Sequence, residues 1–458
     1  MTGNRFHIRR FDGSPYPSGV HSPRTEMHRS TIRALHRLLP AAALLLSLFC
    51  PLSAAADGWH ARIPDDAGTP RRLVAVDKED QKLHIYERHS PLKLAASYVC
   101  TTGQATGDKQ TAGDLKTPEG IYFVVNKLSA GLDMEMYGGI AYTLNYPNPV
   151  DKLRRKTGSG IWIHSKGHDI VPRETKGCIA LNRADIDKTG KLFVPGTPVA
   201  VAGDVSTDAS PPKEDKATAR KLEDKVKGWA KAWGSRSPAM FDYYDADAYT
   251  AAQDESFTAF RSQKERLFKQ LPWIQTSVSD VQVMQGPGYW VTWFNQYYRA
   301  PNMTTEGIRR LYWQPDKKGE YRIVGMEWVP ADVGMEANYL ETVSPQVTAF
   351  VEKWRKAWER GDVKNYIACY AGDAEQAPRK GAASIRQQKQ ELWRKAKPAK
   401  VQLKGLRIEA VAGGVRADMT QDYRDVTGYS DRGVKTLLLR QDGQSWEIVK
   451  EEWSPAAR

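Results

Sequence analysis

The chain is poor in cysteine and histidine, and both shortages narrow the chemistry open to it. Its 458 residues include only 4 Cys and 9 His, and no histidine follows His168. So few cysteines exclude a fold held together mainly by disulfides. No group of Cys, His, Asp and Glu has metal-ligand spacing, so we predict neither a metal nor another cofactor.

Long apolar runs are also missing, except for one near the N-terminus. Leu38 to Phe49 forms that run, behind a basic flank and ahead of three alanines. Such a short run is typical of a cleaved secretory signal, and a retained anchor is the alternative. We therefore interpret 1–56 as a signal peptide and leader, with Met1 or Met27 as the start. The mature protein is expected in the periplasm or cell wall, with membrane contact only through this segment.

Basic residues outnumber acidic ones, and the resulting positive charge indicates which kind of partner the chain could bind. The whole chain has a net charge of +13, and residues 57–458 keep +8 once the leader's seven Arg and two acidic residues are set aside. A moderate basic excess suits an acidic polymer such as a cell wall. Because a secreted chain rarely meets nucleic acid, we expect none as a partner.

The most informative segment contains Ile161-Trp-Ile-His164 and then Thr175-Lys-Gly-Cys178-Ile-Ala-Leu-Asn182. A thiol becomes a good nucleophile near neutral pH when an imidazole takes its proton, and the resulting imidazolium stabilises the thiolate. A glycine before the cysteine permits a sharp turn that aims backbone N–H groups at a developing oxyanion. We therefore predict a cysteine acyl-transfer site.

The cysteine count supports a free thiol in this segment. Beyond the leader the chain keeps Cys100, Cys178 and Cys369. An odd number leaves at least one thiol unpaired in an oxidising compartment. We expect that thiol to be Cys178, and the alternative is a bridge between Cys178 and Cys100.

The pattern of strands, turns and repeats divides the chain into several domains. Residues 57–204 read as a mainly β domain with one short helix near 182–188. Its expected strands are Leu73–Val76, Lys82–Tyr86, Leu94–Val99, Gly120–Val125, Gly160–His164 and Thr197–Ala202. Residues 205–218 are rich in Ser, Asp, Pro and Lys and read as a linker.

The remaining chain is an internal duplication. Trp229-Ala-Lys-Ala-Trp233 recurs as Trp354-Arg-Lys-Ala-Trp358, at an offset of 125 residues that also relates later segments. We expect two α+β copies, at 219–333 and 344–458, joined by a linker at 334–343. Each Trp pair lies on one helix face and is expected in the core.

The order of helices and strands in each copy resembles the NTF2-like fold, a curved sheet wrapped around helices as a cone. The resemblance is carried by the Trp-x₃-Trp pair, the aromatic-Asp segment after it and the closing strands. Domains of this kind include enzymes and binding modules. Since neither copy contains a histidine, we expect binding, dimerisation or spacing.

The first domain resembles the YkuD-type L,D-transpeptidase domain of bacterial cell-wall enzymes. The matching motifs are Gly113-Asp-Leu-Lys-Thr-Pro-Glu-Gly120-Ile-Tyr122, Asn145-Tyr-Pro-Asn148, Ile161-Trp-Ile-His164 and Thr175-Lys-Gly-Cys178-Ile-Ala-Leu-Asn182. The resemblance implies that Cys178 is the nucleophile and His164 its base. It also implies that the Ser165 carbonyl orients the imidazole and that Gly177 and Cys178 supply oxyanion N–H groups.

The chain departs from the family pattern where substrate is held. Many members have Ser-His-Gly-Cys-x-Arg, and here Ala180 replaces that Arg. Lys176 or Arg183 could substitute for it, and Asn182 and Tyr142 are further candidates for substrate contact. The segment 113–120 also resembles a phosphate-binding loop, but it lacks the Gly-Lys-Ser/Thr ending, and we expect a turn with Asp114 and Lys116 at the surface.

These features predict a peptidoglycan-modifying cysteine acyltransferase that acts on the L,D bond of stem tetrapeptides. The Thr-Lys-Gly-Cys-Ile-Ala version is similar to cell-shape-determining L,D-carboxypeptidases, which also carry an NTF2-like domain, so hydrolysis to tripeptide is the alternative. A non-catalytic wall-binding scaffold is the second alternative. A cell-wall protein or a homodimer partner is a candidate partner of the duplicated domains.

Overall fold

The computed structural model of the protein describes residues 58–64, 68–88, 92–208, 212–442 and 445–456. The signal peptide expected at 1–56 therefore lies outside the described residues. Across the described part of the chain, no helix is both long and apolar enough to cross a bilayer.

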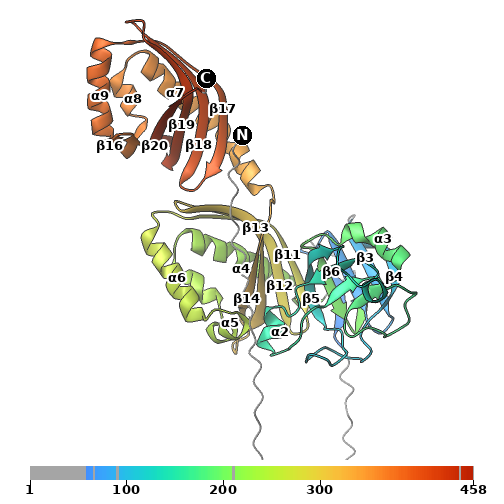
Figure 1. Ribbon diagram of the computed structural model, residues 1–458. Coiled ribbons are helices and arrows are strands. Elements are labelled where there is room, and N and C mark those ends of the chain that lie inside the picture. Colours follow the sequence, from blue (N-terminus) through green and yellow to red (C-terminus); the bar gives the residue numbers. More distant parts are fainter. Residues whose placement is uncertain (1–57, 65–67, 89–91, 209–211, 443–444, 457–458) are drawn as a thin grey trace, which may run out of the picture. The chain divides into compact units, whose positions relative to one another are not determined.

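A closed β-barrel forms the first domain (Figure 1). Its strand order is β2-β3-β4-β8-β7-β6-β5-β9. The strands are β2 (Arg72–Asp77), β3 (Lys82–Arg88), β4 (Leu92–Thr101), β5 (Gly120–Leu128), β6 (Ala141–Leu144), β7 (Trp162–His164), β8 (Ile179–Leu181) and β9 (Pro198–Ala202). The mainly β prediction is thus confirmed, and each expected strand lies within or overlaps one of these.

Short helices and one outer strand pair complete the barrel domain. The helices are α1 (Met134–Tyr137), α2 (Pro149–Leu153), α3 (Arg183–Thr189) and η1 (Gly190–Leu192). Outside the barrel, β1 (His60–Pro64) pairs in parallel with β10 (Asp204–Asp208). The helix expected near 182–188 is α3.

Several barrel strands are buried on both faces. Along β2, Val74 and Val76 point into the barrel, whereas Leu73 and Ala75 belong to a second apolar cluster outside it. Alternation along a strand sends neighbouring side chains to opposite faces. The outer cluster therefore needs a second layer to cover it.

The first copy supplies that layer. Its sheet has the order β11-β12-β13-β14, from β11 (Gln275–Gly286), β12 (Tyr289–Ala300), β13 (Met303–Pro315) and β14 (Tyr321–Pro330). On β12, Val291 and Trp293 join the outer cluster of the barrel, and the Trp293 ring meets the Phe123 ring edge-on at 5.3 Å. The barrel and the first copy thus share one hydrophobic core.

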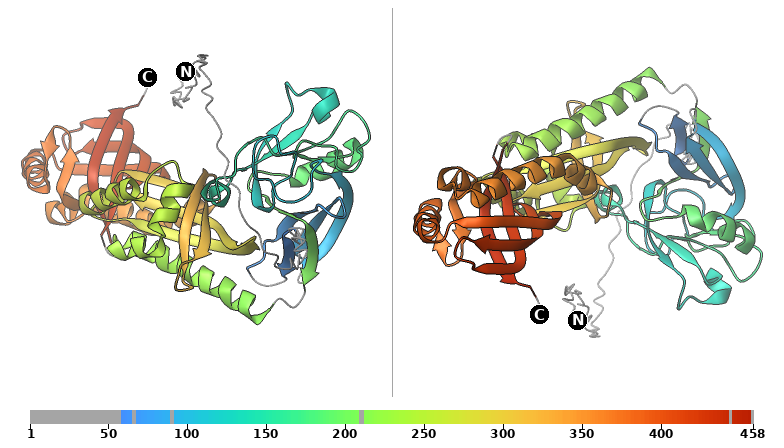
Figure 2. Two further views of the ribbon diagram at one scale, coloured as in Figure 1. Left: turned by 90° about the horizontal axis from the view of Figure 1, so that it is seen from below. Right: turned by 90° about the horizontal axis from the view of Figure 1, so that it is seen from above.

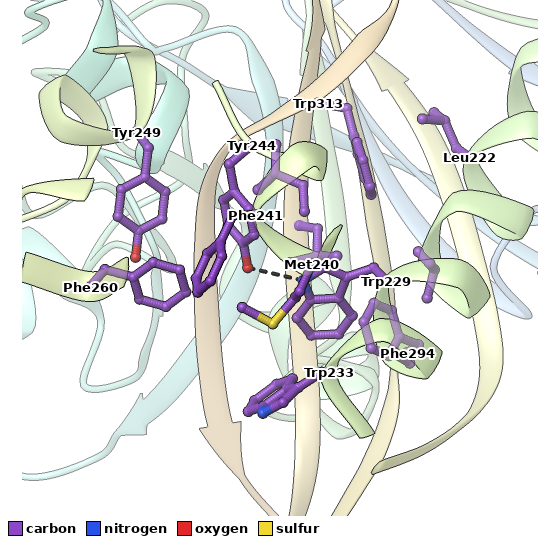
Figure 3. Close-up of a cluster of buried hydrophobic side chains, with 14 of the residues drawn as sticks. Leu222, Trp229, Trp233, Met240, Phe241, Tyr244, Tyr249, Phe260, Phe294 and Trp313 are labelled. Carbon is purple, nitrogen blue, oxygen red and sulfur yellow. Dashed lines mark hydrogen bonds between the residues drawn. The ribbon is translucent and has the colours of Figure 1, made fainter. Parts of the chain in front are cut away.

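The other face of this sheet packs on the copy's own helices. These are α4 (Lys213–Gly234), η2 (Pro238–Tyr243), α5 (Ala246–Ala252) and α6 (Phe257–Gln270). Figure 3 shows this core, in which the Trp229 indole N–H donates to the Tyr244 hydroxyl at 3.0 Å. Trp229 and Trp233 are both buried, as their spacing predicts.

The second copy repeats this arrangement around a separate core. Its helices are α7 (Met335–Glu359), α8 (Val363–Ile367) and α9 (Ala382–Lys395). Its sheet has the order β16-β15-β20-β19-β18-β17, from β15 (Tyr370–Gln376), β16 (Arg379–Lys380), β17 (Pro398–Val411), β18 (Gly414–Asp425), β19 (Ser430–Asp442) and β20 (Ser445–Pro455). In both copies the helices lie along one face of the sheet (Figure 2).

Both expected linkers are more structured than predicted. Within 205–218, β10 occupies the start and α4 begins at Lys213, so only 209–212 separate the two elements. Residues 335–343 of the second expected linker are helical, because α7 starts at Met335 and continues through Pro345 to Glu359. The expected linker is thus mostly the first part of α7, which Gly334 precedes as the N-cap residue.

The cones of the two copies differ in how far they are filled. The first has a cavity of about 30 Å³, among side chains that include Met240, Phe260 and Met326. The second has a cavity of about 670 Å³, with lining residues that include Trp393, Lys389 and Glu451. At the 125-residue offset, Met326 corresponds to Glu451. A carboxylate thus lines the large cavity of the second copy where a methionine lines the small cavity of the first.

Candidate active site

His164 is held in one orientation by its own neighbour. It ends β7 and is buried, and its Nδ1 lies 2.5 Å from the Ser165 carbonyl oxygen. A carbonyl only accepts hydrogen bonds, so Nδ1 must carry the proton and Nε2 is left as the proton acceptor. The geometry therefore has the ring-orienting contact that the family resemblance implies.

Cys178 lies one residue before β8, the parallel neighbour of β7. In the register of this pair, His164 is opposite Ala180. Residues two apart on a strand share a face, so Cys178 and His164 belong to the same face of the barrel wall. The Cys178 Sγ also lies 3.4 Å from the Gly160 carbonyl oxygen.

A hydroxyl shapes the turn that carries the cysteine. Thr175 Oγ1 donates to the Cys178 carbonyl oxygen at 2.7 Å and accepts the Gly177 N–H at 3.1 Å. This contact corrects the expected oxyanion site, because the Gly177 N–H is already bound within the turn. The expectation for an oxyanion donor therefore falls on the Cys178 N–H.

Glycine is required at position 177 for two reasons. Its φ of +131° lies in a region that residues with a Cβ rarely adopt. A Cβ at this position would also lie 2.8 Å from the Lys116 carbonyl oxygen. The segment 113–120 thus packs against the turn that carries Cys178.

Burial shifts the pKa of both Cys178 and His164. Desolvation raises the pKa of the Cys178 thiol above its usual 9.0, and this outweighs the opposing effects of the Trp162 N–H and Lys109. Desolvation also lowers the pKa of His164 below 6.5. Both shifts favour a neutral thiol beside a neutral imidazole. The thiolate–imidazolium pair expected from the sequence stays a prediction, and burial works against it in the unliganded site.

An aromatic side chain packs against the His164 ring. Tyr137, at the end of α1, meets the His164 ring edge-on at 5.2 Å and the Trp162 ring at 5.1 Å. Burial raises the pKa of Tyr137, and the charge of a Cys178 thiolate would raise it further. Sequence reasoning missed Tyr137 because 131–140 shows neither helical nor strand periodicity.

Arg183 and Ser165 hold the turn that follows Tyr137. Both donate to the Gly138 carbonyl oxygen, Ser165 through its hydroxyl at 3.3 Å and Arg183 through Nη1. Arg183 also pairs with Asp187 at 3.0 Å. The guanidinium expected to hold a substrate carboxylate is thus engaged in supporting the wall of the site.

The other residues expected at the substrate have different surroundings. Tyr142 is buried in the barrel core, with its ring 5.0 Å from Phe193, so that prediction is wrong because β6 turns it inward. The Asn182 side chain accepts the Ile170 N–H at 3.1 Å and ties the segment after β7 to β8. Lys176 is exposed beside the turn, and its role stays a prediction.

The loop before β5 is built around Asp114. This carboxylate accepts N–H groups of Gln110, Thr111 and Lys116 and pairs with Lys109 at 2.7 Å. These donors hold the pKa of Asp114 well below its usual value, although burial opposes the shift. Asp114 is therefore a loop anchor rather than the surface residue expected. Lys109 is the nearby buried cation that the sequence did not reveal.

The loop leads directly into β5, which agrees with the turn predicted there over a phosphate-binding loop. Cys100, Cys178 and Cys369 are free thiols, so the alternative bridge between Cys100 and Cys178 does not form. Among the described residues, no group of three or more His, Cys, Asp or Glu is arranged to hold a metal ion.

Models of two known protein families match these domains. Residues 71–201 match the model of the L,D-transpeptidase catalytic domain, YkuD. Residues 221–327 and 346–452 each match the Cds6 C-terminal NTF2-like domain. Both resemblances inferred from the motifs are thereby confirmed.

Individual relatives cover parts of the chain. It is 27% identical over 175 residues to YafK of Escherichia coli, an L,D-transpeptidase by name, across 38% of this chain and 65% of YafK. The match thus spans less than two thirds of YafK. Among solved structures, Bd1075 of Bdellovibrio bacteriovorus is 28% identical over 57% of this chain and 94% of its own, with a TM-score of 0.47. The helical cell shape determining protein Pgp2 of Campylobacter jejuni is 26% identical over 59% and 92%, with a TM-score of 0.44.

Proposed function

Since the chain carries a YkuD L,D-transpeptidase catalytic domain followed by two Cds6-type NTF2-like domains, we propose that it is a peptidoglycan-modifying cysteine acyltransferase. The substrate is the stem tetrapeptide, and the bond attacked joins its third residue to the terminal D-alanine. The observation that carries the proposal is the contact between His164 Nδ1 and the Ser165 carbonyl oxygen, which leaves Nε2 as a base near Cys178.

The reaction begins from the neutral pair. The Cys178 sulfur attacks the carbonyl carbon of the third residue while His164 Nε2 takes the thiol proton. The oxyanion is stabilised by the Cys178 N–H. The C–N bond to D-alanine then breaks, and the imidazolium returns its proton to the leaving amine. A thioester on Cys178 remains.

The group that attacks the thioester determines which product forms. An amine of a neighbouring stem or of a protein gives a cross-link, and the enzyme is then a transpeptidase. Water gives the free tripeptide, and the enzyme is then an L,D-carboxypeptidase. Because both routes pass through the same thioester, we propose the acyltransferase and keep the two outcomes as results of one experiment.

That experiment gives disaccharide-tetrapeptide to the purified protein and measures products by mass spectrometry. Cross-linked dimer identifies a transpeptidase, and tripeptide identifies a carboxypeptidase. Cys178→Ala should lower turnover by about 1,000-fold or more, because no thioester forms. Cys369→Ala is the matched control in the second copy. Equal activity of Cys178→Ala and wild type would contradict the proposal.

A second function is favoured by the open cone of the second copy. Its cavity of about 670 Å³ combines aromatic rings such as Trp358 and Tyr423 with polar groups such as Gln421. Aromatic faces with polar neighbours suit sugar and peptide ligands. We propose that this copy binds wall fragments and that the protein acts in the periplasm or cell wall after export.

Sedimentation with purified sacculi tests the second function. Lys389→Met changes the open cone, and Lys264→Met changes the corresponding residue of the closed cone. Only the first substitution should weaken co-sedimentation. If both proteins sediment like wild type, the cone is not the wall site. If the protein instead dimerises, or binds a cell-wall protein in the absence of sacculi, the duplicated domains would be the site that binds this partner.

A further inference from the structure

One edge of β5 is not covered by its neighbouring strand. β5 spans Gly120–Leu128, but β6 has only four residues and pairs with β5 from Val124 onward. The first half of β5 therefore needs other partners for its backbone groups. Side chains provide them: the Tyr289 hydroxyl accepts the Ile121 N–H at 2.8 Å, and Asn145 Oδ1 accepts the Phe123 N–H at 2.7 Å.

One of these two side chains comes from the first copy, and the other is held by it. The Asn145 amide nitrogen donates to the carboxylate of Glu327 at 3.0 Å and to the Tyr312 hydroxyl at 3.2 Å. Arg310 pairs with the same carboxylate at 3.1 Å. The Arg310 guanidinium also lies over the Phe123 ring at 3.9 Å.

These contacts lead to the catalytic histidine through one short strand. Asn145 directly follows β6. At the other end of β6, Ala141 is paired with His164, and between them Thr143 is paired with Trp162. The position of β6 along β5 thus fixes the register of β7. A shift of β6 would displace His164 relative to Cys178. Small displacements of reacting groups lower the reaction rate strongly.

We infer that the first copy is a part of the catalytic unit, in which Glu327 acts through Asn145 and β6 as a positioning residue for His164. The inference rests on the proposed acyl-transfer function. Glu327 touches neither reacting group, since its contacts are Asn145, Tyr312 and Arg310. Its effect is on the alignment of His164 with Cys178.

The second copy provides a matched control. At the 125-residue offset Glu327 corresponds to Glu452. Glu452 is exposed and pairs with Lys450 of its own strand at 2.6 Å. Because Glu452 also lines the second cone, the control is Glu447→Gln on the same strand. Glu447 pairs with Arg440 at 2.6 Å, as Glu327 pairs with Arg310, and holds no part of the barrel, so this substitution is expected to leave turnover unchanged.

The test is a pair of substitutions in the full chain that break and then restore the contact. Asn145→Asp keeps an acceptor for the Phe123 N–H but sets a carboxylate against Glu327. Adding Glu327→Gln returns a donor to the pair with the roles exchanged. We expect Asn145→Asp to lower kcat on disaccharide-tetrapeptide about tenfold with KM little changed, and the double variant to recover most of it.

A readout without substrate separates this inference from the proposed function. The pH dependence of Cys178 alkylation by iodoacetamide depends on the alignment of His164 and not on the acyl donor. Its midpoint should move in Asn145→Asp and return in the double variant. If wild type does not turn over tetrapeptide, the proposed function fails, while the alkylation profile still tests the positioning.

Folding is followed by thermal unfolding of each variant. Should Asn145→Asp not fold, Glu327→Gln alone carries the test, with an expected two- to fivefold loss of kcat from the weakened Arg310 contact. The inference is overturned if folded Asn145→Asp matches wild type in kcat and alkylation, if the double variant recovers neither, or if Glu447→Gln loses as much kcat as Glu327→Gln.

Discussion

The orientation of His164 determines which of its nitrogens can act as a base. The Ser165 carbonyl fixes the proton on Nδ1, and the edge of Tyr137 packs against the same ring. Burial shifts the pKa of both His164 and Cys178 toward their neutral forms. Proton transfer therefore belongs to the attack itself, rather than to a step that precedes binding.

The neutral pair predicts slow alkylation of the nucleophile near neutral pH. The rate follows the thiolate fraction, and the pKa of Cys178 lies above 9.0 because of desolvation. Labelling by iodoacetamide, measured for each cysteine by mass spectrometry, should be slower at pH 7 than for a small free thiol and should still rise above pH 9. Rapid labelling at pH 6 would instead mean a thiolate–imidazolium pair.

Substitution of Gly177 should disturb the site without removing a reactive group. Gly177→Ala meets both an unfavourable φ and the Lys116 carbonyl oxygen. Local strain of about 1–3 kcal/mol should misplace Cys178 and reduce turnover about ten- to a hundredfold. Steady-state kinetics measures the loss, and Gly113→Ala, which has open space for a Cβ, is the control for a positive φ alone.

For single residues, the sequence was most informative where the chemistry requires a particular residue type. Cys178, His164 and the ring-orienting carbonyl follow from the motifs. The use of the Gly177 N–H by Thr175 and the direction of the two pKa shifts depend on turn geometry and burial, which a motif does not encode. Tyr142 was misplaced for a related reason, because the motif does not say which barrel face a residue of β6 occupies.

Among the elements, β12 and β18 show how the two copies have diverged. β12 is buried along nearly its whole length, whereas β18 alternates between buried and partly exposed positions. Val291 and Trp293 of β12 correspond at the 125-residue offset to Arg416 and Asp418, which form an ion pair at 2.9 Å. A run apolar on both strand faces indicates burial on both sides. Comparing the two repeats strand by strand would therefore have revealed the docking face.

The closing strand β20 places a carboxylate in the second cone and supports a stability prediction. Burial opposes ionisation of Glu451, but Lys435 and Lys389 lower its pKa from 4.5 to about 2. Lys435 pairs with it at 2.5 Å, and Tyr366 donates to it at 3.2 Å. Glu451→Gln should lower the free energy of unfolding at pH 7 by about 3 kcal/mol.

The sign of the pH dependence follows from the lowered pKa. An unfolded Glu451 binds its proton near pH 4.5 and the folded one near pH 2, so this contribution is fully present above pH 4.5. It is lost as pH falls from about 4.5 to 2. Urea unfolding at several pH values measures it, and Glu451→Gln should lack this part of the acid sensitivity. An unchanged acid profile would contradict the assignment.

For the whole molecule, the shared core defines the units that unfold together. The barrel and the first copy contribute to one apolar cluster, whereas the cluster of the second copy contains only its own residues. Cooperative units follow buried contacts rather than sequence domains. The barrel and the first copy should therefore unfold as one unit, and the second copy as another.

Calorimetry of the full chain tests this division with two substitutions. Trp293→Ala should cost the larger unit about 3–5 kcal/mol and lower its transition by about 10 °C. Glu451→Gln should lower only the other transition. The expectation fails if Trp293→Ala splits the larger transition so that the barrel melts unchanged, or if either substitution shifts both transitions equally.

The common core of the barrel and the first copy also limits how such a gene can be rearranged. Recombination that deleted the first copy or joined it to another enzyme would expose the outer faces of β2 and β5 to water, and selection would remove the product. The second copy contacts the first, for example where the Arg299 guanidinium lies over the Tyr339 ring at 3.8 Å, but its apolar core cluster contains only its own residues. It can be exchanged, lost or duplicated again, and we expect descendants of this chain to vary there while inheriting the rest intact.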